Sequence, residues 1–251
     1  MRTVGIDLAT TEKNTAVCVV DWSETVVCVG FQDDATDDGL IQVCRDATVD
    51  KVGIDCPFGW PSPFVAAISA HALGQAWPGR GHVNPSAFRK TLAFRLTDLR
   101  VQENAPGARP LSVAADKLGH TAMRCALLLD ALGSVDRTGR SGKTAEVYPT
   151  ASLQSWKPHG LLLGDSLAVL GQLEKLIPTM TFQPRAHARC IESDHAFDAL
   201  ICAMTARAVA TDRTTQPVTA EEVGRAAVEG WIHVPTVGPH ELVHEYPCRA
   251  R

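Results

Sequence analysis

The sequence predicts an α/β fold with a mixed central sheet, in which three antiparallel strands are followed by parallel strands and helices flank the sheet. Two observations lead to this fold class. The first thirty residues hold three segments rich in Val, Ile, Thr and Cys that are separated by short turns. A fourth apolar segment is reached only through a helical segment, which places it parallel to the first strand and beside it. The 251 residues can bury a full core, so a single domain over residues 1–251 is expected.

The first half of the chain supplies the start of the sheet. Strands are expected over 3–8, 15–21, 25–31 and 51–56. The aspartates between 33 and 38 offer N-caps for a helix over about 39–46, which connects the third strand to the fourth.

An insertion over about 57–110 follows the fourth strand. Pro57, Pro61 and Pro63 end that strand, and a helix is expected over 63–73. The stretch 74–110 mixes Gly, Pro, Arg and aromatic residues without sustained periodicity, which predicts irregular structure with short helices near 85–92. Because long irregular loops are often functional, this segment is a candidate part of a site.

The second half of the chain adds further helices and strands. Apolar spacing predicts helices over 112–132, 165–176, 195–210 and 220–229, and strands over 144–148 and 231–234. The helix over 195–210 is apolar on nearly every side, so it is expected to be buried.

Composition and charge narrow the function classes. The formal net charge of −4 excludes a global positive field that would drive non-specific nucleic-acid binding, so any such contact needs a local basic patch. None of the eight cysteines forms a C-x-x-C pair, which argues against a zinc ribbon. Free thiols and the lack of a long apolar run predict a cytoplasmic protein without membrane insertion.

Two aspartates occupy matching places in the sequence. Asp7 ends the strand in VGIDLA, and Asp55 ends the next parallel strand in VGIDCP. Because neighbouring strands lie about 4.8 Å apart, these carboxylates should be neighbours. Like charges that close either raise one pKa or bind a divalent cation, and oxygen ligands favour Mg²⁺ or Mn²⁺. The alternative is that each aspartate only caps the loop after its strand.

A third acidic group begins the late apolar helix. Asp194 and Asp198 are four residues apart and therefore lie on one face, with His195 between them. Asp194 is best explained as the helix N-cap. Asp198 lies in the second turn among apolar residues, where an unpaired charge is costly, so a binding role is expected. His195 is either a surface residue or part of the site.

Five short motifs together resemble one family. GIDLA, GIDCPFGWP, RLTD, EVYPTA and SDHAFDALICA are similar to the predicted nucleases called domain of unknown function 429, and the resemblance spans most of the chain. The order of elements and of the acidic residues also resembles the ribonuclease H and RuvC resolvase superfamily.

The resemblance implies a metal-dependent nuclease that hydrolyses phosphodiester bonds of DNA or RNA. Asp7, Asp55 and Asp198 then correspond to the ligands of Mg²⁺ or Mn²⁺, and in two-metal chemistry the ions activate water and stabilise the leaving oxygen. Related enzymes have a fourth acid, for which Asp194, Glu146 and Asp98 are the candidates. Because RuvC-like relatives often act as dimers, the resemblance also allows a homodimer.

The family resemblance also concerns the motif RLTD. It implies that Arg95, Thr97 and Asp98 face the cleft, where Arg95 could bind a phosphate or carboxylate and Asp98 could orient it. The alternative is an Arg–Asp pair that fastens the loop. The basic residues of the insertion could follow a phosphate backbone or form a solvated loop: Arg80, His82, Arg89, Lys90, Arg100 and Arg109.

Two other function classes remain open. GIDLATT also resembles the first phosphate loop of actin-like ATPases and sugar kinases, although a second Gly-rich phosphate loop is not found. A ribonuclease H-like scaffold that binds a nucleotide or a protein without catalysis is the third possibility.

Overall fold

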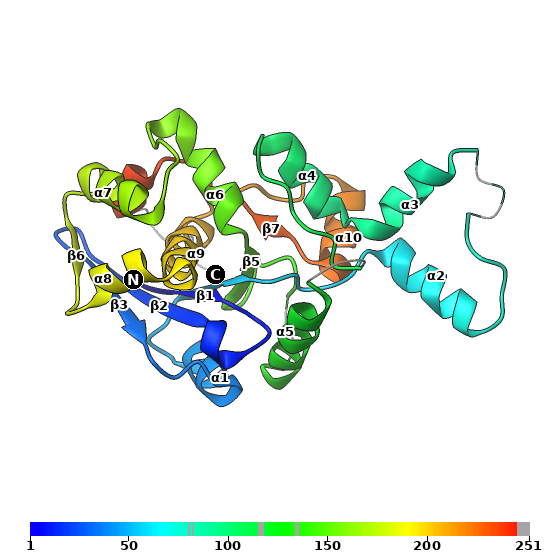
Figure 1. Ribbon diagram of the computed structural model, residues 1–251, viewed down its shortest axis with the longest axis horizontal. Coiled ribbons are helices and arrows are strands. Elements are labelled where there is room, and N and C mark those ends of the chain that lie inside the picture. The colour runs from blue at the N-terminus through cyan, green and yellow to red at the C-terminus, as the bar shows by residue number, and fades with distance from the viewer. Residues whose placement is uncertain (80, 82, 115–117, 134–135, 245–251) are drawn as a thin grey trace.

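A seven-stranded mixed sheet forms the centre of the computed structural model, which describes residues 1–79, 81, 83–114, 118–133 and 136–244 (Figure 1). The strand order is β6-β3-β2-β1-β4-β5-β7. No helix in the described part of the chain is long and apolar enough to cross a membrane.

The predicted antiparallel meander is confirmed. Its strands are β1 (Arg2–Asp7), β2 (Ala16–Trp22) and β3 (Val27–Gln32), each within about two residues of its expected limits. β4 (Lys51–Asp55) pairs with β1 in parallel, as expected from the helix that precedes it.

Three further strands extend the sheet at its two sides. β5 (Thr144–Val147) is parallel to β4, and β7 (Ile232–His233) is parallel to β5. β6 (Met180–Phe182) is parallel to β3 on the opposite side. β6 was not predicted, because three residues are too few to show an alternating pattern.

Helices cover both faces of the sheet, as predicted (Figure 1). On one face α1 (Asp37–Arg45) and α5 (Gly119–Ala131) enclose a core with β1 and β4. The other face carries α6 (Pro149–Trp156), α7 (Ser166–Leu176), α8 (Ala186–Glu192) and the central helix α9 (Asp194–Ala210). Thirteen of the seventeen residues of α9 are buried, which confirms the prediction made from its apolar sequence.

Two glycines allow α9 to lie directly on the sheet. A Cβ atom on Gly5 of β1 would stand 2.0 Å from the backbone oxygen of Ala199, and one on Gly53 of β4 would stand 2.6 Å from that of Cys202. Side chains there would push α9 away, since neither neighbour is a flexible side-chain end. The glycine two residues before each aspartate therefore fixes how closely α9 approaches Asp7 and Asp55.

The insertion after β4 contains more regular structure than predicted. α2 (Ser62–Ala72) and α3 (Pro85–Ala93) project away from the sheet (Figure 1). α4 (Leu96–Asn104) instead packs against β7 and α10 (Ala220–Glu229). The expectation of irregular structure over 74–110 is wrong for 96–104, because tertiary contacts stabilise a helix whose own apolar periodicity is weak.

Several other limits and caps also differ from the prediction. α1 is capped by Thr36, whose Oγ1 accepts from Gly39, rather than by an aspartate. α9 is capped by Ser193, so Asp194 is its first residue and not its N-cap. α5 begins at Gly119, and α6 and α8 were missed. The described residues also form three short 3₁₀ helices: Glu12–Asn14, Lys157–His159 and Pro239–Val243.

Candidate active site

Asp7 and Asp55 lie side by side at the carboxyl edge of the sheet. Asp7 ends β1, Asp55 ends β4, and the two residues are direct partners in the parallel register. Asp7 is buried and Asp55 is partly buried. The close pair that the sequence predicts is therefore present.

Asp198 joins this pair electrostatically from α9. Burial, together with the charges of Asp7 and Asp194, raises the pKa of Asp198 to about 7, although the charge of His195 acts against the rise. Burial also raises the pKa of Asp55 well above its usual range, with added effects from Asp7, Asp198 and Glu146. Burial raises the pKa of all three carboxyls, and Asp7 acts on both of the others, so they share one weakly solvated region, which we call the acidic cluster (Asp7, Asp55 and Asp198).

His195 contacts the acidic cluster directly. Its Nδ1 lies 2.6 Å from Oδ2 of Asp7, while about half of the imidazole remains exposed. Burial raises the pKa of Asp7, and the hydrogen bond and charge of His195 act against that rise. His195 is therefore an exposed residue whose imidazole contacts the acidic cluster.

Asp194 lies outside the acidic cluster. It is exposed at the start of α9, and its Oδ1 is 3.4 Å from Oγ of Ser166. Its charge is one cause of the raised pKa of Asp198.

Glu146, Arg95 and Asp98 form a buried ionic network beside the cluster. Arg95 Nη2 lies 2.7 Å from Glu146 Oε1 and 2.8 Å from Asp98 Oδ1, and Nη1 donates to Glu146 Oε2 at 2.8 Å. Nη1 also donates to the backbone oxygen of Glu229, and Nε to Asp98 Oδ2. Each of the five guanidinium N–H groups therefore has a protein acceptor.

Electrostatics agree with a structural network. Burial alone would lower the pKa of Arg95, but the charges of Asp98 and Glu146 raise it above its ordinary value. Both oxygens of Glu146 are occupied, since Oε2 also accepts from the backbone N–H of Phe58 at 2.9 Å. This geometry favours the alternative in which Arg95 and Asp98 fasten the insertion, and it leaves Glu146 and Asp98 poorly placed to supply a fourth metal ligand.

Thr97 is also engaged by the protein. It is buried, and its Oγ1 accepts from the backbone N–H of Ile232 in β7 at 2.8 Å. Together with Arg95 it ties α4 to the end of the sheet.

A cavity of about 260 Å³ opens between the acidic cluster and the ionic network. Asp7 and Asp55 line one part of it, and Arg95, Asp98 and Glu146 line another. Tyr148, which sequence reasoning did not identify, lines it as well, and burial raises the pKa of its phenol. Its position after β5 was the available signal, because side chains at the carboxyl ends of parallel strands meet at one edge.

The donor chemistry of the acidic cluster fits a hard divalent cation, since carboxylate oxygens are the preferred ligands of Mg²⁺. The side chains are not arranged as a preformed site: within the described ranges, no three His, Cys, Asp or Glu residues are grouped so that they could hold an ion. His195 contacts Oδ2 of Asp7, so a cation that used this oxygen would have to displace the imidazole.

Arg124 of α5 is a further residue that the sequence did not reveal. Its Nη1 donates to the backbone oxygen of Ala9 and to Oγ1 of Thr15, both at 2.7 Å, and its Nε pairs with Asp37 at 2.8 Å. It therefore fixes the loop that follows Asp7. Nothing in the local sequence distinguishes it from other helix arginines.

The basic residues of the insertion do not act as one group. Arg100 pairs with Glu103 and Glu222. Arg89 and Lys90 lie on α3, and Arg109 is exposed on the loop after α4. Arg80 and His82 lie outside the described residues.

A comparison with protein-family models matches residues 5–222 to a family described as "Protein of unknown function (DUF429)". Comparisons with curated proteins and with solved structures yield no match. The matched segment begins in β1 and ends in α10, so it contains the acidic cluster and the ionic network. Because this model covers most of the chain, the protein belongs to the DUF429 family.

Proposed function

We propose that the protein is a metal-dependent nuclease with a ribonuclease H-like fold, and that Asp7, Asp55 and Asp198 hold Mg²⁺ or Mn²⁺. The observation that carries this proposal is the acidic cluster itself. Asp7 raises the pKa of both Asp55 and Asp198, Asp198 also raises that of Asp55, and Asp7 and Asp55 line a cavity. Buried like charges are retained at a cost in stability, which is typical of functional sites.

The order of elements supports the ribonuclease H-like assignment. The antiparallel meander, the parallel β4 beside β1 and the late buried helix occur in the order that the superfamily requires. The acidic residues stand on β1, β4 and α9, which are the elements that carry the ligands in that superfamily.

Each residue of the cluster has a distinct part in the proposed chemistry. Asp7 and Asp55 are the two metal-binding carboxylates at the edge of the sheet, and Asp198 is the third, on α9. A bound divalent cation lowers the pKa of a coordinated water and stabilises charge on a phosphate. His195, half-exposed beside Asp7, is placed to move a proton between solvent and the reacting groups.

The ionic network plays a supporting part in this proposal. Arg95 neutralises part of the negative charge of Glu146 and Asp98 and holds the wall of the cavity in place. It is not free to bind substrate while those contacts persist. The substrate phosphate therefore meets the acidic cluster from the open side of the cavity.

The test is a parallel measurement of metal binding and hydrolysis. Mn²⁺ is titrated by calorimetry into the wild-type protein, Asp7→Asn, Asp198→Asn and a control, Asp130→Asn, whose carboxylate is exposed on α5. Labelled DNA, RNA and hybrid strands are then incubated with each protein and Mn²⁺. Loss of binding and of cleavage in the two cluster variants, with a normal control, supports the proposal.

Other outcomes favour the alternatives. ATP hydrolysis without strand cleavage would replace the nuclease with a phosphotransferase. Metal or nucleotide binding without any hydrolysis would indicate a non-catalytic binding domain. Sedimentation of the same samples tests the expected homodimer.

A further inference from the structure

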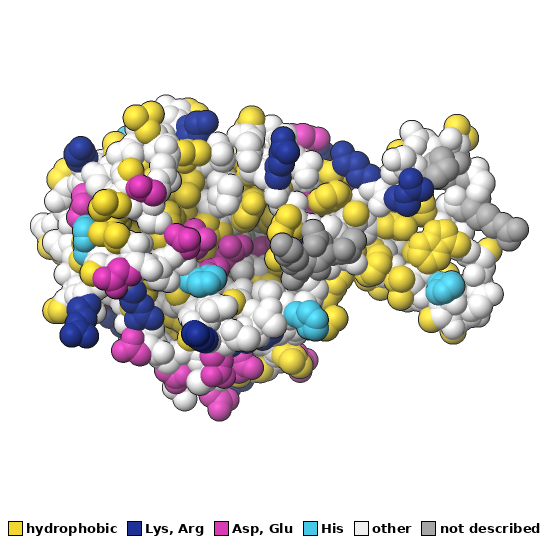
Figure 2. Space-filling model, viewed as in Figure 1, with side chains coloured by type: hydrophobic (Ala, Val, Ile, Leu, Met, Phe, Trp, Pro, Cys, Tyr) yellow, Lys and Arg dark blue, Asp and Glu magenta, His cyan; other side chains and the backbone are white. Residues whose placement is uncertain are grey.

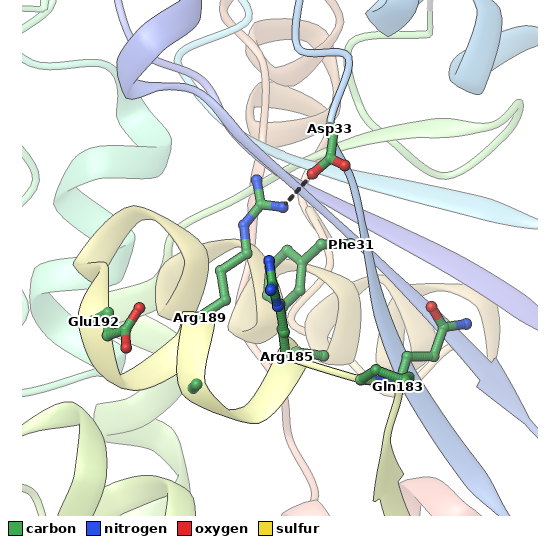
Figure 3. A pocket seen from close by; sticks show the side chains of 9 residues that line it. Phe31, Asp33, Gln183, Arg185, Arg189 and Glu192 are labelled. Atoms are coloured by element: carbon green, nitrogen blue, oxygen red, sulfur yellow. Dashed lines mark hydrogen bonds and ion pairs between the residues drawn. The ribbon is translucent and has the colours of Figure 1, made fainter.

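A second cavity lies at the same edge of the sheet as the acidic cluster. It has a volume of about 640 Å³ and is lined in part by Phe31, Asp33, Gln183, Arg185, Arg189 and Glu192 (Figure 3). β1 and β3 are both antiparallel to β2, and β6 is parallel to β3. The carboxyl ends of β3 and β6, where this cavity lies, therefore face the same way as those of β1 and β4.

The strand order gives the distance between this cavity and Asp7. β3 is two strands from β1 and β6 is three strands away. With about 4.8 Å between strands, the cavity is displaced from Asp7 by roughly 10–14 Å along the edge. A single nucleic-acid strand carries one phosphate per ~3.4 Å of helical rise, so a strand bound at Asp7 would reach this cavity within a few nucleotides.

Arg185 is the first cationic group of the cavity. Its φ of 68° is a left-handed conformation that costs a non-glycine residue on the order of 1 kcal/mol. The side chain is exposed, and it forms no hydrogen bond or ion pair with the described residues. A strained backbone therefore presents a guanidinium without a carboxylate partner just after β6.

Arg189 is the second cationic group, one helical turn further along α8. Its guanidinium stacks over Phe31 at 4.9 Å and pairs with Asp33 at 2.7 Å. Asp33 is almost fully exposed, and exposed ion pairs contribute only about 0–1 kcal/mol. A phosphate can therefore replace Asp33 as the partner while Phe31 keeps the guanidinium in place.

The two arginines present their charges together. Figure 3 shows both guanidinium groups extending the same way beside Phe31, whereas the carboxylate of Glu192 lies apart from them on α8. Lys or Arg side chains are visible over α8 with acidic side chains beside them, and further acidic side chains lie over α9 on the same face of the molecule (Figure 2). Two neighbouring arginines with fork-shaped donors are suited to phosphate oxygens.

We infer that Arg185 and Arg189 form a phosphate-binding subsite for a nucleic-acid strand whose reacting phosphate lies at the acidic cluster. This inference rests on the proposed nuclease function. It gives the direction of the bound nucleic acid, which extends from β1 across β2 towards β3 and β6. The subsite adds positive charge at this edge of an acidic protein.

The experiment measures strand binding without cleavage. Fluorescence anisotropy of labelled 12-nucleotide DNA and RNA is followed in EDTA at several salt concentrations for wild type, Arg185→Gln, Arg189→Gln and the double variant. Arg2→Gln is the matched control, because Arg2 also forms a partly exposed pair with an aspartate, Asp21 at 2.7 Å, but at the opposite edge of the sheet. Inorganic phosphate and a nucleoside monophosphate are added as competitors.

The expected result is a roughly fivefold loss of affinity for each single variant. The slope of the logarithm of the binding constant against the logarithm of the salt concentration should become smaller in magnitude by about 0.7 per lost phosphate contact. Arg2→Gln should bind like wild type. Competition by inorganic phosphate at concentrations similar to those of the strand would mean a free-phosphate site and overturn the strand inference. Wild-type binding by the double variant, or no strand binding by wild type, would also overturn it.

The proposed function is read out separately. Asp7→Asn should still bind the strand in EDTA and fail to cleave it with Mn²⁺. Normal strand affinity in Arg185→Gln, together with loss of cleavage in Asp7→Asn, would reject the subsite and leave the nuclease standing. Reduced affinity in Arg185→Gln, with no cleavage by any protein, would leave a strand-binding site without the proposed activity.

Discussion

Nδ1 of His195 lies 2.6 Å from Oδ2 of Asp7, so the first turn of α9 is joined to the end of β1 by an imidazole–carboxylate pair. The pair connects the acidic cluster to solvent, because about half of the His195 side chain is exposed while Asp7 is nearly covered. Proton movement to or from the reacting groups would pass through this contact.

His195→Gln should lower kcat for strand cleavage by about 10²-fold, the usual lower range for loss of an acid–base group. His187→Gln is the control, since His187 is also half-exposed and lies 3.4 Å from a carboxylate, that of Glu174. Steady-state rates over pH 6 to 9 provide the measurement. Equal rates for both variants would show that His195 takes no part in the reaction, whereas a lower rate with an unchanged pH profile would make it only a positioning residue of Asp7.

Asp55→Asn should stabilise the metal-free protein. The folded-state pKa of Asp55 is raised, mainly by burial, so its carboxyl contributes stability below the unfolded pKa and loses it as pH rises through the folded value. At pH 8 the variant should gain on the order of 1–2 kcal/mol in the free energy of unfolding, and at pH 4 much less.

Asp136→Asn is the matched control, for which the free energy of unfolding should change in the opposite direction. Burial works to raise the pKa of Asp136, but hydrogen bonds from Thr138 and Ser141 lower it overall. Its removal should therefore destabilise the protein at pH 8. Urea denaturation in EDTA compares the two variants, and a destabilised Asp55→Asn would contradict the reading of the acidic cluster.

Mn²⁺ affinity should increase with pH through the pKa of Asp198, about 7. Below this pKa the carboxyl must release a proton before it can bind the cation, so affinity should fall by up to about tenfold per pH unit. Calorimetry at pH 5.5, 6.5, 7.5 and 8.5 measures the trend. Asp198→Asn should bind weakly with a flatter dependence, and an unchanged slope in that variant would remove Asp198 from the ligand set.

Arg95→Met should destabilise the protein by about 3–5 kcal/mol, because it leaves the buried Glu146 and Asp98 without their partner. Arg100→Met is the control: Arg100 makes two ion pairs that are partly exposed, and its loss should cost roughly 1 kcal/mol or less. Chemical denaturation measures the free energy of unfolding of both variants. Similar small losses would show that the network is not structural.

Gly5→Ala should prevent the close packing of α9 on β1, since the added Cβ meets the backbone of α9 at 2.0 Å. A loss of at least about 2–3 kcal/mol is expected, together with weaker Mn²⁺ binding as Asp198 moves away from Asp7. Gly171→Ala on α7 is the control, because a Cβ there meets nothing within 4 Å. The two melting temperatures and the calorimetric affinities are compared.

Much of the fold could be predicted from local patterns. The meander, β4 and the buried α9 have strong apolar signals, and their short connections leave few ways to arrange them. The same reasoning placed Asp7 beside Asp55, because adjacent parallel strands that both end in GID bring their last residues to one edge. β6 and α4 were missed or misjudged because they depend on partners distant in sequence.

The sequence by itself determined the strand order around β1 and the neighbourhood of Asp7 and Asp55, since both follow from periodicity and connection length. Only the tertiary structure decided what the remaining polar residues do. Arg95 turned inward to Glu146, 51 residues away, because a buried carboxylate needs a cation. Arg185 and Arg189 joined the same edge as Asp7 because β6 pairs with β3, and pairing between distant segments is not written in the local pattern of either one.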